Sequence, residues 1–369
     1  MKVLHICNHF WPSKGGIEKF VFDLCRESKK IGVDAEVLCL NKPHHSKEVL
    51  PPISEVEGIR VTRVPFLNLK YYKPALLPLN KLREFDVLHV HGVGALLDFV
   101  VLTKGIHRKP IVVSTHGGVF HTKAISGIKK LYFFGLQKMI LKGVDKVVAC
   151  SRNDLELFKP ISNKMVLIEN GAELDRFSVC DGVPKQENVF LFVGRLSKNK
   201  QIDRLLPAFG KLHKMGIRFT LRIVGSDWEG IAPRLQELSK ALGIAEWVFF
   251  AGEVSDEELV SEYCAASFFV SASRYEGFGI SAIEAMACGC VPILNRISAF
   301  EYFVKDGVNG FLLDFSDSKQ TAKRIQEIMQ MDMRNIRKSA QNSAQQFDWS
   351  HQMKEWDALY ARVGAAGSK

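Results

Sequence analysis

The strongest chemical signal in this chain is a glycine-rich segment between two carboxylates, residues 276–284 (EGFGISAIE). Gly277 and Gly279 permit a tight loop before a helix, where backbone N–H groups and the helix dipole favour a phosphate. The carboxylates of Glu276 and Glu284 suit hydroxyl groups, because they accept hydrogen bonds strongly from sugar O–H. The segment therefore indicates a phosphate flanked by sugars. A glycine turn that only caps a helix is the structural alternative.

Two cations follow an apolar run at 189–194, which is expected to be a buried strand. Arg195 offers a guanidinium fork for phosphate oxygens, and Lys200 offers a second, mobile cation. In open α/β sheets, ligands bind at the carboxyl ends of the strands, where these side chains would lie. The pair favours a diphosphate ligand, and solvated surface cations are the structural alternative.

Two further loops carry residues that could bind a ligand. Gly15 and Gly16 follow the first apolar run but fit neither a dinucleotide fingerprint nor a P-loop, which weakens both of those enzyme classes. His116 follows the run 111–115 and precedes another Gly-Gly loop. No third ligand is spaced to make a metal site with His116 and His121, and the chain has no Asp-x-Asp pair, so we expect no metal.

Short apolar runs alternate with helical patterns along most of the chain, which predicts strands buried in parallel sheets. A polar stretch at 179–188 separates two such series. We therefore expect an α/β fold of two doubly wound, Rossmann-like domains that face a central cleft. An aromatic helical stretch near the end is expected to pack back against the first domain. The expected parts are residues 1–180, 186–346 and 347–369.

Composition sets the class of protein. The chain has 369 residues, of which 24% are charged and 47% hydrophobic, which is typical of a globular protein and rules out a disordered or disulfide-dense one. The net charge is +10, and the first 170 residues hold 26 basic against 15 acidic side chains. A basic half is consistent with nucleic acid, an anionic membrane or a phosphorylated substrate. The eight cysteines are expected to be buried reduced thiols, because none has C-x-x-C spacing.

A basic, aromatic-rich stretch in the first half could lie on an anionic bilayer, although a core helix with a solvated lysine face is the alternative. The expected membrane or acceptor side consists of Lys123, Lys129, Lys130, Tyr132 and Phe133.

In chain order, these motifs resemble the GT-B glycosyltransferases of family four, and the resemblance covers nearly the whole chain. The motifs that carry it are the P-x-x-G-G opening, N-G-x-x-x-x-R-F at 170–177, V-G-R-L at 193–196, the E-x7-E segment, D-G-V-N-G-F-L at 306–312 and the final F-D-W with its helix. One departure is Gln201, which stands where the family usually has glycine after the lysine.

The resemblance implies a role for each matching position. The donor diphosphate would be held by Gly16, Arg195, Lys200, Gly279, Ile280 and Ser281. The nucleoside would be bound by Val254 at the base and by Glu284 at the ribose. The catalytic side chains would be His116, against the donor sugar, and Glu276, on the sugar hydroxyls. The family retains anomeric configuration without a metal, so no cofactor is expected.

The loop 115–122 (THGGVFHT) is similar to that of α-mannosyltransferases that use GDP-mannose on polyprenyl-diphosphate-linked saccharides in exopolysaccharide assembly. We therefore expect a cytoplasmic, membrane-peripheral enzyme that transfers mannose from GDP-mannose to a lipid-linked saccharide. The alternatives are a UDP-sugar donor, a GT-B nucleotide-sugar epimerase, a catalytically silent scaffold and a basic nucleic-acid-binding protein. The last has no recognised nucleic-acid module to support it, so no nucleic-acid partner is expected.

Overall fold

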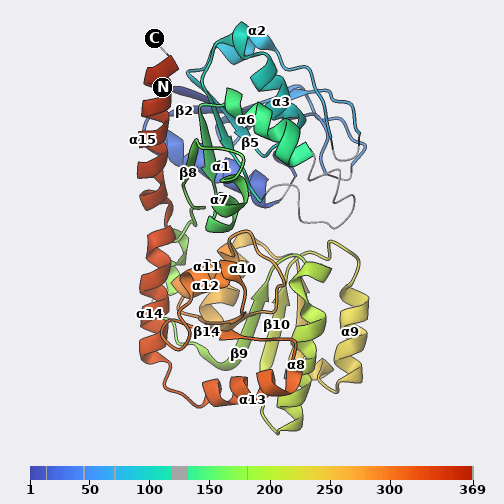
Figure 1. Ribbon diagram of the computed structural model, residues 1–369. Coiled ribbons are helices and arrows are strands. Elements are labelled where there is room, and N and C mark those ends of the chain that lie inside the picture. Colours follow the sequence, from blue (N-terminus) through green and yellow to red (C-terminus); the bar gives the residue numbers. More distant parts are fainter. Residues whose placement is uncertain (14, 45, 70–71, 118–131, 181, 368–369) are drawn as a thin grey trace. The chain divides into compact units, whose positions relative to one another are not determined.

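The computed structural model describes all residues except 14, 45, 70–71, 118–131, 181 and 368–369 (Figure 1). The chain forms two compact units. Unit 1 consists of Met1–Gly171 together with Trp349–Lys369, and unit 2 consists of Ala172–Asp348. Each unit contains one mainly parallel sheet covered by helices, which confirms the expected fold class.

The sheet of unit 1 has the strand order β3-β4-β2-β1-β5-β6-β7-β8. Only the β3–β4 pair is antiparallel, and the other neighbours are parallel. The sheet is built from β1 (Lys2–Ile6), β2 (Asp34–Leu40), β3 (Ile53–Val56), β4 (Ile59–Val64), β5 (Val87–His91), β6 (Ile111–Ser114), β7 (Lys146–Ala149) and β8 (Met165–Leu167). The order reverses between β1 and β5, so the loops after these strands lie at a topological switch point, where doubly wound folds bind ligands.

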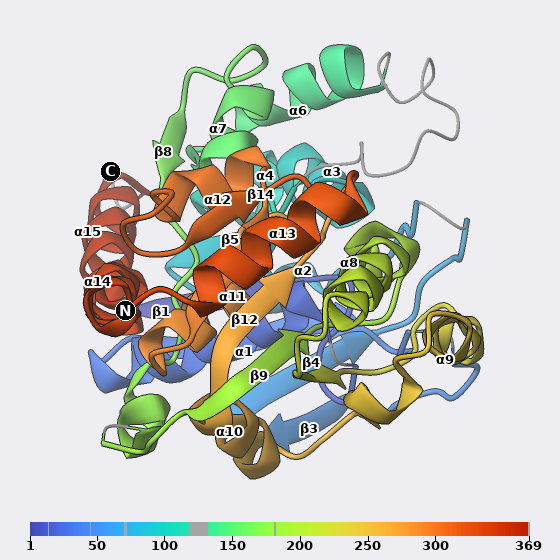
Figure 2. The same ribbon diagram turned by 90° about the horizontal axis from the view of Figure 1, so that it is seen from below.

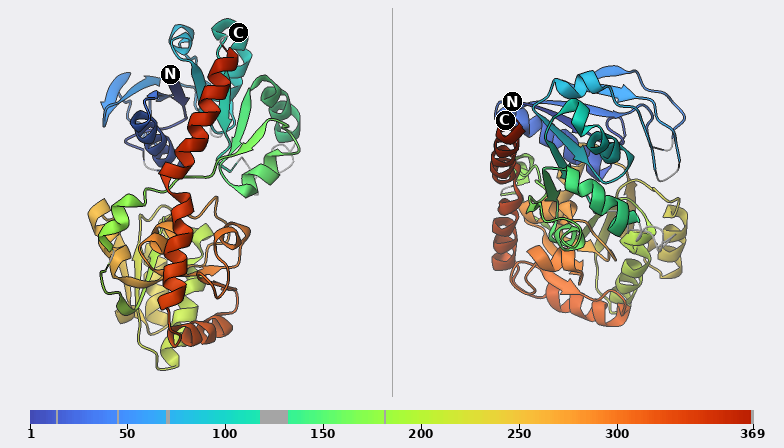
Figure 3. Two further views of the ribbon diagram at one scale, coloured as in Figure 1. Left: turned by 90° about the vertical axis from the view of Figure 1, so that its left-hand side faces the viewer. Right: turned by 45° about the horizontal axis from the view of Figure 1, so that its top comes forward.

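Helices cover both faces of this sheet, because each carries an apolar side that must be buried. They are α1 (Gly16–Lys30), α2 (Leu79–Arg83), α3 (Ala95–Leu102), α4 (Lys104–His107), the π-helix η1 (Tyr132–Gln137), α6 (Lys138–Gly143) and α7 (Arg152–Phe158). Helix α15 (Trp349–Gly367) joins them from the other end of the sequence and packs beside α1 (Figure 3). Its Trp356 and Tyr360 are fully buried with the α1 face, which confirms that the last helix returns to the first domain.

The sheet of unit 2 is entirely parallel and has the strand order β11-β10-β9-β12-β13-β14. It is built from β9 (Gln186–Val193), β10 (Thr220–Val224), β11 (Val248–Gly252), β12 (Ala266–Ser271), β13 (Val291–Asn295) and β14 (Phe311–Leu313). The order reverses between β9 and β12, which lie side by side in Figure 2. The loops after β9 and β12 therefore lie at the switch point of this unit.

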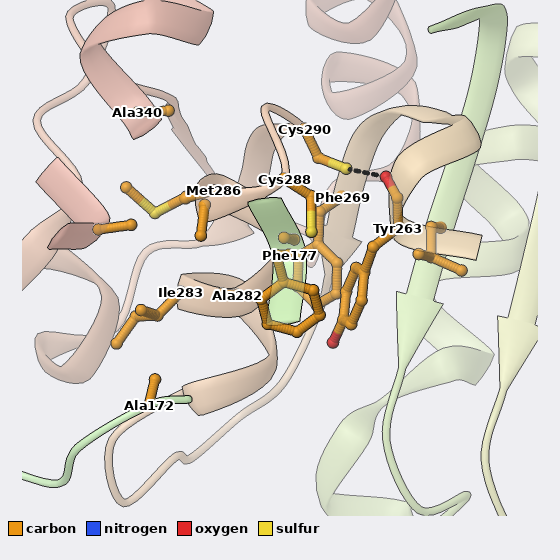
Figure 4. Packing of buried hydrophobic residues seen from close by; sticks show 14 of the residues in the cluster. Ala172, Phe177, Tyr263, Phe269, Ala282, Ile283, Met286, Cys288, Cys290 and Ala340 are labelled. Carbon is orange, nitrogen blue, oxygen red and sulfur yellow. Dashed lines mark hydrogen bonds between the residues drawn. The ribbon is translucent and has the colours of Figure 1, made fainter. Parts of the chain in front are cut away.

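Two apolar cores lie on the two faces of this sheet, and the helices of unit 2 enclose them. The helices are η2 (Asp175–Cys180), η3 (Lys198–Lys200), α8 (Ile202–Lys214), α9 (Ala232–Ala241), η4 (Ala245–Trp247), α10 (Asp256–Ala265), α11 (Ile280–Ala287), α12 (Ser298–Phe303), α13 (Ser318–Met329), α14 (Arg334–Ala344) and η5 (Gln345–Phe347). Figure 4 shows part of the core in which Phe177, Tyr263 and Phe269 pack beside α11.

The expectation that every cysteine is a reduced thiol is wrong for two of the eight. Cys180 at the end of η2 and Cys264 in α10 form a disulfide across 84 residues of sequence, with 4.9 Å between their Cα atoms. Spacing could not reveal this pair, because the fold alone brings η2 beside α10. The other six cysteines are free and buried, as expected.

Candidate functional site

In unit 2 the glycine-rich segment forms the turn from β12 into α11. Gly279 is the residue before the helix and has a φ of 95°, a left-handed conformation that favours glycine. A Cβ atom there would lie 2.8 Å from the ring of Phe300, so the position also has no room for a side chain. Ile280 and Ser281 are the first two residues of α11, where backbone N–H groups have no acceptor within the helix. The turn thus has the backbone conformation and the helix N-terminus that favour an anion.

The loop after β9 places both predicted cations at the same switch point. Arg195 is exposed, and its guanidinium carbon lies 4.8 Å above the centre of the Trp228 ring. Lys200 is half-buried, and its Nζ atom lies 2.6 Å from Oε1 of Glu276. The structure therefore brings together two residues that are 76 positions apart and that the sequence assigned to diphosphate and sugar.

Gln201, which stands where the family usually has glycine, lies in this loop. Gln201 has φ 49° and ψ 42°, which is the left-handed region, and it precedes α8. A side-chain-bearing residue there keeps the conformation that a glycine would adopt most easily. The departure consequently places a side chain at a left-handed position.

Glu284 is buried in α11, and its carboxylate accepts two hydrogen bonds from other elements. Nη2 of Arg176 donates to Oε1 at 2.9 Å, and the hydroxyl of Tyr263 donates to Oε2 at 3.0 Å. Burial raises the pKa of Tyr263 well above its ordinary value, and the nearby Glu284 carboxylate raises it further. The phenol is therefore a protonated donor at neutral pH. Val254, predicted to border the base, lies half-buried between β11 and α10.

In unit 1 His116 follows β6 in a left-handed conformation with a φ of 46°. Such a backbone is uncommon outside glycine and occurs often at functional positions. Asp154 holds the loop, because its Oδ2 accepts from the Thr115 hydroxyl and from the Gly117 N–H, each at 2.8 Å. Phe20 packs edge-on against the His116 ring with 4.8 Å between the ring centres. The ring is consequently fixed on several sides.

A row of histidines extends from His116 into the core, and sequence reasoning missed it. Nε2 of His116 lies 3.0 Å from Nδ1 of His91, and Nε2 of His91 lies 3.0 Å from Nδ1 of His5. The His89 ring lies beside that of His91, tilted by 37° with 4.1 Å between the ring centres, and it hydrogen-bonds Ser114 and Tyr360, each at 2.8 Å. The alternation His89-x-His91 in β5, and the pairing of His5 with His89 across β1 and β5, are the signals that could have revealed it.

Three of these histidines are close enough together to hold a metal ion, namely His5, His89 and His91. Their contacts favour a hydrogen-bonded network instead. Both ring nitrogens of His89 and both of His91 already have partners, and only Nε2 of His5 is buried without one. A metal would have to replace these hydrogen bonds.

Burial keeps the histidines neutral. It lowers the pKa of His116 to about 4 and that of His5 to about 3, because a buried imidazolium loses hydration. Burial also lowers the pKa of His89 and of His91 well below the ordinary value, and neighbouring histidines add to the effect. At neutral pH His116 can donate or accept a hydrogen bond but carries no charge.

The first glycine-rich loop precedes α1. Gly16 begins this helix, and a Cβ atom there would meet nothing within 4 Å, which leaves room for a ligand. A Cβ atom on Gly15 would instead clash with the carboxylate of Glu18, which folds back over the loop. Burial alone would raise the pKa of Glu18. The hydrogen bond from Nε2 of His44, at 2.8 Å, acts together with a backbone hydrogen bond and the nearby His44 and His9 rings to outweigh burial, so the net shift of this pKa is downward.

The predicted membrane side is described only in part. Lys123, Lys129 and Lys130 lie outside the described residues, as does the side chain of Tyr132. Phe133 is fully buried in the core of unit 1, with its ring centre 5.0 Å from that of Phe158. It offers no surface to a membrane here, because the π-helix turns its ring toward the sheet. Among the described residues, no helix combines the length and apolar character needed to cross a bilayer.

Comparisons with known proteins decide the family. Residues 14–176 match the family model described as Glycosyltransferase Family 4, and residues 178–347 match the one described as Glycosyl transferases group 1. A GDP-mannose:cellobiosyl-diphosphopolyprenol alpha-mannosyltransferase of Komagataeibacter xylinus is 32% identical over 98% of this chain and 93% of its own. The chain therefore belongs to the glycosyltransferase family that these models and this relative define. A protein with the same description from Xanthomonas oryzae is 30% identical over 95% of this chain and 94% of its own.

Solved structures agree on the fold of this glycosyltransferase. The Anabaena protein HepE in complex with UDP aligns with a TM-score of 0.77, covers 98% of this chain and 100% of its own, and is 20% identical. The chain is thus a hexosyltransferase with the GT-B fold, and the expected enzyme class is confirmed.

Proposed function

We propose that this glycosyltransferase transfers mannose from GDP-mannose to a polyprenyl-diphosphate-linked saccharide, with retention at the anomeric carbon and without a metal. The observation that carries the proposal is the similarity, over nearly the full length of both chains, to relatives described as GDP-mannose:cellobiosyl-diphosphopolyprenol alpha-mannosyltransferases. The arrangement of unit 2 supports it, because cations, a helix N-terminus and carboxylates surround one switch point.

In this proposal Arg195 and Lys200 bind the donor diphosphate, with the N–H groups of Ile280 and Ser281. As the bond between sugar and phosphate breaks, negative charge grows on the leaving diphosphate and positive charge on the sugar ring. The Lys200 ammonium, already held against Glu276 at 2.6 Å, supplies the positive charge that a metal supplies in other transferases. The departing phosphate oxygen takes the proton of the acceptor hydroxyl on the same face of the sugar.

The carboxylates bind neutral hydroxyl groups. Glu284 accepts from the ribose, and Glu276 accepts from the donor sugar. Because Glu276 forms an ion pair with Lys200, the negative charge of Glu276 is compensated and does not repel the diphosphate. Val254 borders the base, and Gly16 lets the backbone approach the diphosphate. In unit 1 the neutral His116 ring is proposed to hydrogen-bond the donor sugar.

We also propose that unit 1 binds an anionic membrane peripherally, on the inner face of the cytoplasmic membrane in exopolysaccharide synthesis. Phe134, Leu136 and Met139 are exposed by 51, 43 and 66%, and the exposed Lys138 and Lys142 lie in the same segment. Exposed apolar side chains beside lysines are the combination that interfacial segments use. In a flotation assay the protein should rise with anionic vesicles, and Met139→Asp should reduce the fraction that rises. Equal flotation with zwitterionic vesicles would contradict an electrostatic contribution to membrane binding.

The test of the reaction is transfer of radiolabelled mannose from GDP-mannose to cellobiosyl-diphosphopolyprenol in the presence of EDTA. We expect an α-linked product, and we expect Arg195→Ala to reduce the rate of transfer strongly. Lys198→Ala is the matched control, because Lys198 is exposed on the same loop. Conversion of GDP-mannose to an epimeric nucleotide sugar without acceptor would support the epimerase alternative instead.

A UDP-sugar is the second candidate donor, and the relative HepE of Anabaena binds UDP in its solved structure. Calorimetric titration with GDP, UDP and ADP in parallel separates the candidates. Preference for GDP supports the mannosyl donor, preference for UDP replaces it, and no binding contradicts the assignment of the donor site.

A further inference from the structure

The two donors that hold Glu284 come from two separate elements. Arg176 lies in η2, a short 3-10 helix, and Tyr263 lies near the end of α10. They bond the two oxygens of the same carboxylate, at 2.9 and 3.0 Å. Glu284 is only 6% exposed, so its orientation depends on these contacts more than a solvated carboxylate would.

The Cys180–Cys264 disulfide joins these same two elements. Cys180 ends η2 four residues after Arg176, and Cys264 directly follows Tyr263. Between them the Phe177 ring packs edge-on against Tyr263, with 5.5 Å between ring centres, as Figure 4 shows. One covalent bond therefore links the two elements whose side chains orient Glu284.

The two elements differ in how much else holds them. The Tyr263 carbonyl accepts from the Cys290 thiol at 3.2 Å, the dashed line in Figure 4, and from Nζ of Lys185 at 2.8 Å. Arg176 has fewer restraints: its guanidinium carbon lies 4.5 Å from the centre of the Phe177 ring, and its Nε atom is buried with no hydrogen-bond partner. A 3-10 helix adds little rigidity of its own. Loss of the disulfide should therefore loosen Arg176 more than Tyr263.

We propose that Arg176 and Tyr263 are positioning residues for Glu284, and that the Cys180–Cys264 disulfide makes the Arg176 contact depend on thiol redox state. The oxidised protein then binds the donor nucleotide more tightly than the reduced protein. This inference rests on the proposed function, because it takes Glu284 as the ligand of the donor ribose. Reduction by a dithiol breaks the S–S bond, leaves two cysteine thiols and converts the dithiol to its own disulfide, so two electrons and two protons pass to the protein.

The experiment is calorimetric titration of GDP into the oxidised protein and into the same protein reduced with dithiothreitol, well below the melting temperature. Alkylation and mass measurement of the denatured protein give the thiol count in each state. We expect six alkylated cysteines before reduction and eight after it. The Kd for GDP should rise about three- to tenfold on reduction, the range expected for the loss of one hydrogen bond of typical net strength.

Variants separate positioning from general stability. Cys180→Ser with Cys264→Ser should bind GDP as weakly as the reduced protein and should not respond to dithiothreitol. Arg176→Gln should weaken binding and abolish the redox response, whereas Tyr263→Phe should weaken binding and keep it. Cys25→Ala, at a free cysteine buried in unit 1, is the matched control and should keep the full response.

Two results would overturn the proposal while the proposed function stands: equal Kd values in the two states, or eight thiols in the air-oxidised protein. Absence of binding by GDP, UDP and ADP in both states would overturn the proposed function and this inference with it. Because the main comparison uses the natural sequence in both states, it does not depend on any variant folding.

Discussion

Nζ of Lys200 lies 2.6 Å from Oε1 of Glu276, so two residues from the loops after neighbouring strands β9 and β12 form one half-buried ion pair. The pair is at the switch point of unit 2, where the proposed donor diphosphate and donor sugar meet. Each side chain is thus held in place by the other before a ligand arrives.

The first prediction concerns this pair. Lys200→Ala should lower kcat/KM for the donor about 100-fold or more, because it removes a cation aimed at the leaving diphosphate. Glu276→Gln keeps the size of the side chain and should lower kcat with a smaller effect on donor affinity. Steady-state kinetics at varied donor concentration measure both. Lys198→Ala should have little effect, and an equally large loss there would show that loop folding, and not the Lys200 charge, is being measured.

How far the sequence predicts this site follows from where its signals lie. Arg195, Lys200 and Gly279 were identifiable because each lies in the segment that follows an apolar run that forms a strand, which places it near a sheet edge. The partners of Glu284 were not identifiable, since Arg176 and Tyr263 lie in other elements and meet it only through tertiary packing.

The histidine row also depends on tertiary contacts that the sequence does not reveal. His5 and His91 lie in short apolar runs, which predict strands, but the contact between them depends on β1 lying next to β5, which the strand order decides. The edge strand β3 gives a weaker signal in the sequence. Strand β3 is half-exposed, so it lacks the continuous apolar run that identified the central strands.

The second prediction concerns the effect of low pH on stability through the buried histidines. A histidine with a folded-state pKa below its unfolded value binds fewer protons when folded, so stability falls as the pH drops below the unfolded value of about 6.5. For His5, whose folded-state pKa is about 3, the cost between pH 6.5 and 5 is about 2 kcal/mol. Urea unfolding at pH 7.5, 6 and 5 should show this loss. His5→Leu should lose less unfolding free energy over the same pH range. A pH dependence unchanged by this substitution would contradict the claim that His5 is neutral in the folded protein.

The third prediction concerns the two glycines of the donor loop. Gly279→Ala places a Cβ atom 2.8 Å from the Phe300 ring at a φ of 95°, so it should destabilise unit 2 by about 1–3 kcal/mol and weaken nucleotide binding. A Cβ atom on Gly277 would meet no atom within 4 Å, so Gly277→Ala should fold normally. Thermal melting and calorimetry of both variants make the comparison. Equal destabilisation by the two variants would show that the left-handed turn is not what the loop requires.

The last prediction concerns the link between the end of the sequence and the first sheet. The Tyr360 hydroxyl in α15 lies 2.8 Å from Nδ1 of His89 in β5, and both residues are fully buried. Tyr360→Phe keeps the ring but leaves Nδ1 of His89 without a partner, which should cost about 1–3 kcal/mol of unfolding free energy. Urea unfolding should show the loss. A Tyr360→Phe variant as stable as the natural protein would mean that α15 is held to β5 by packing alone.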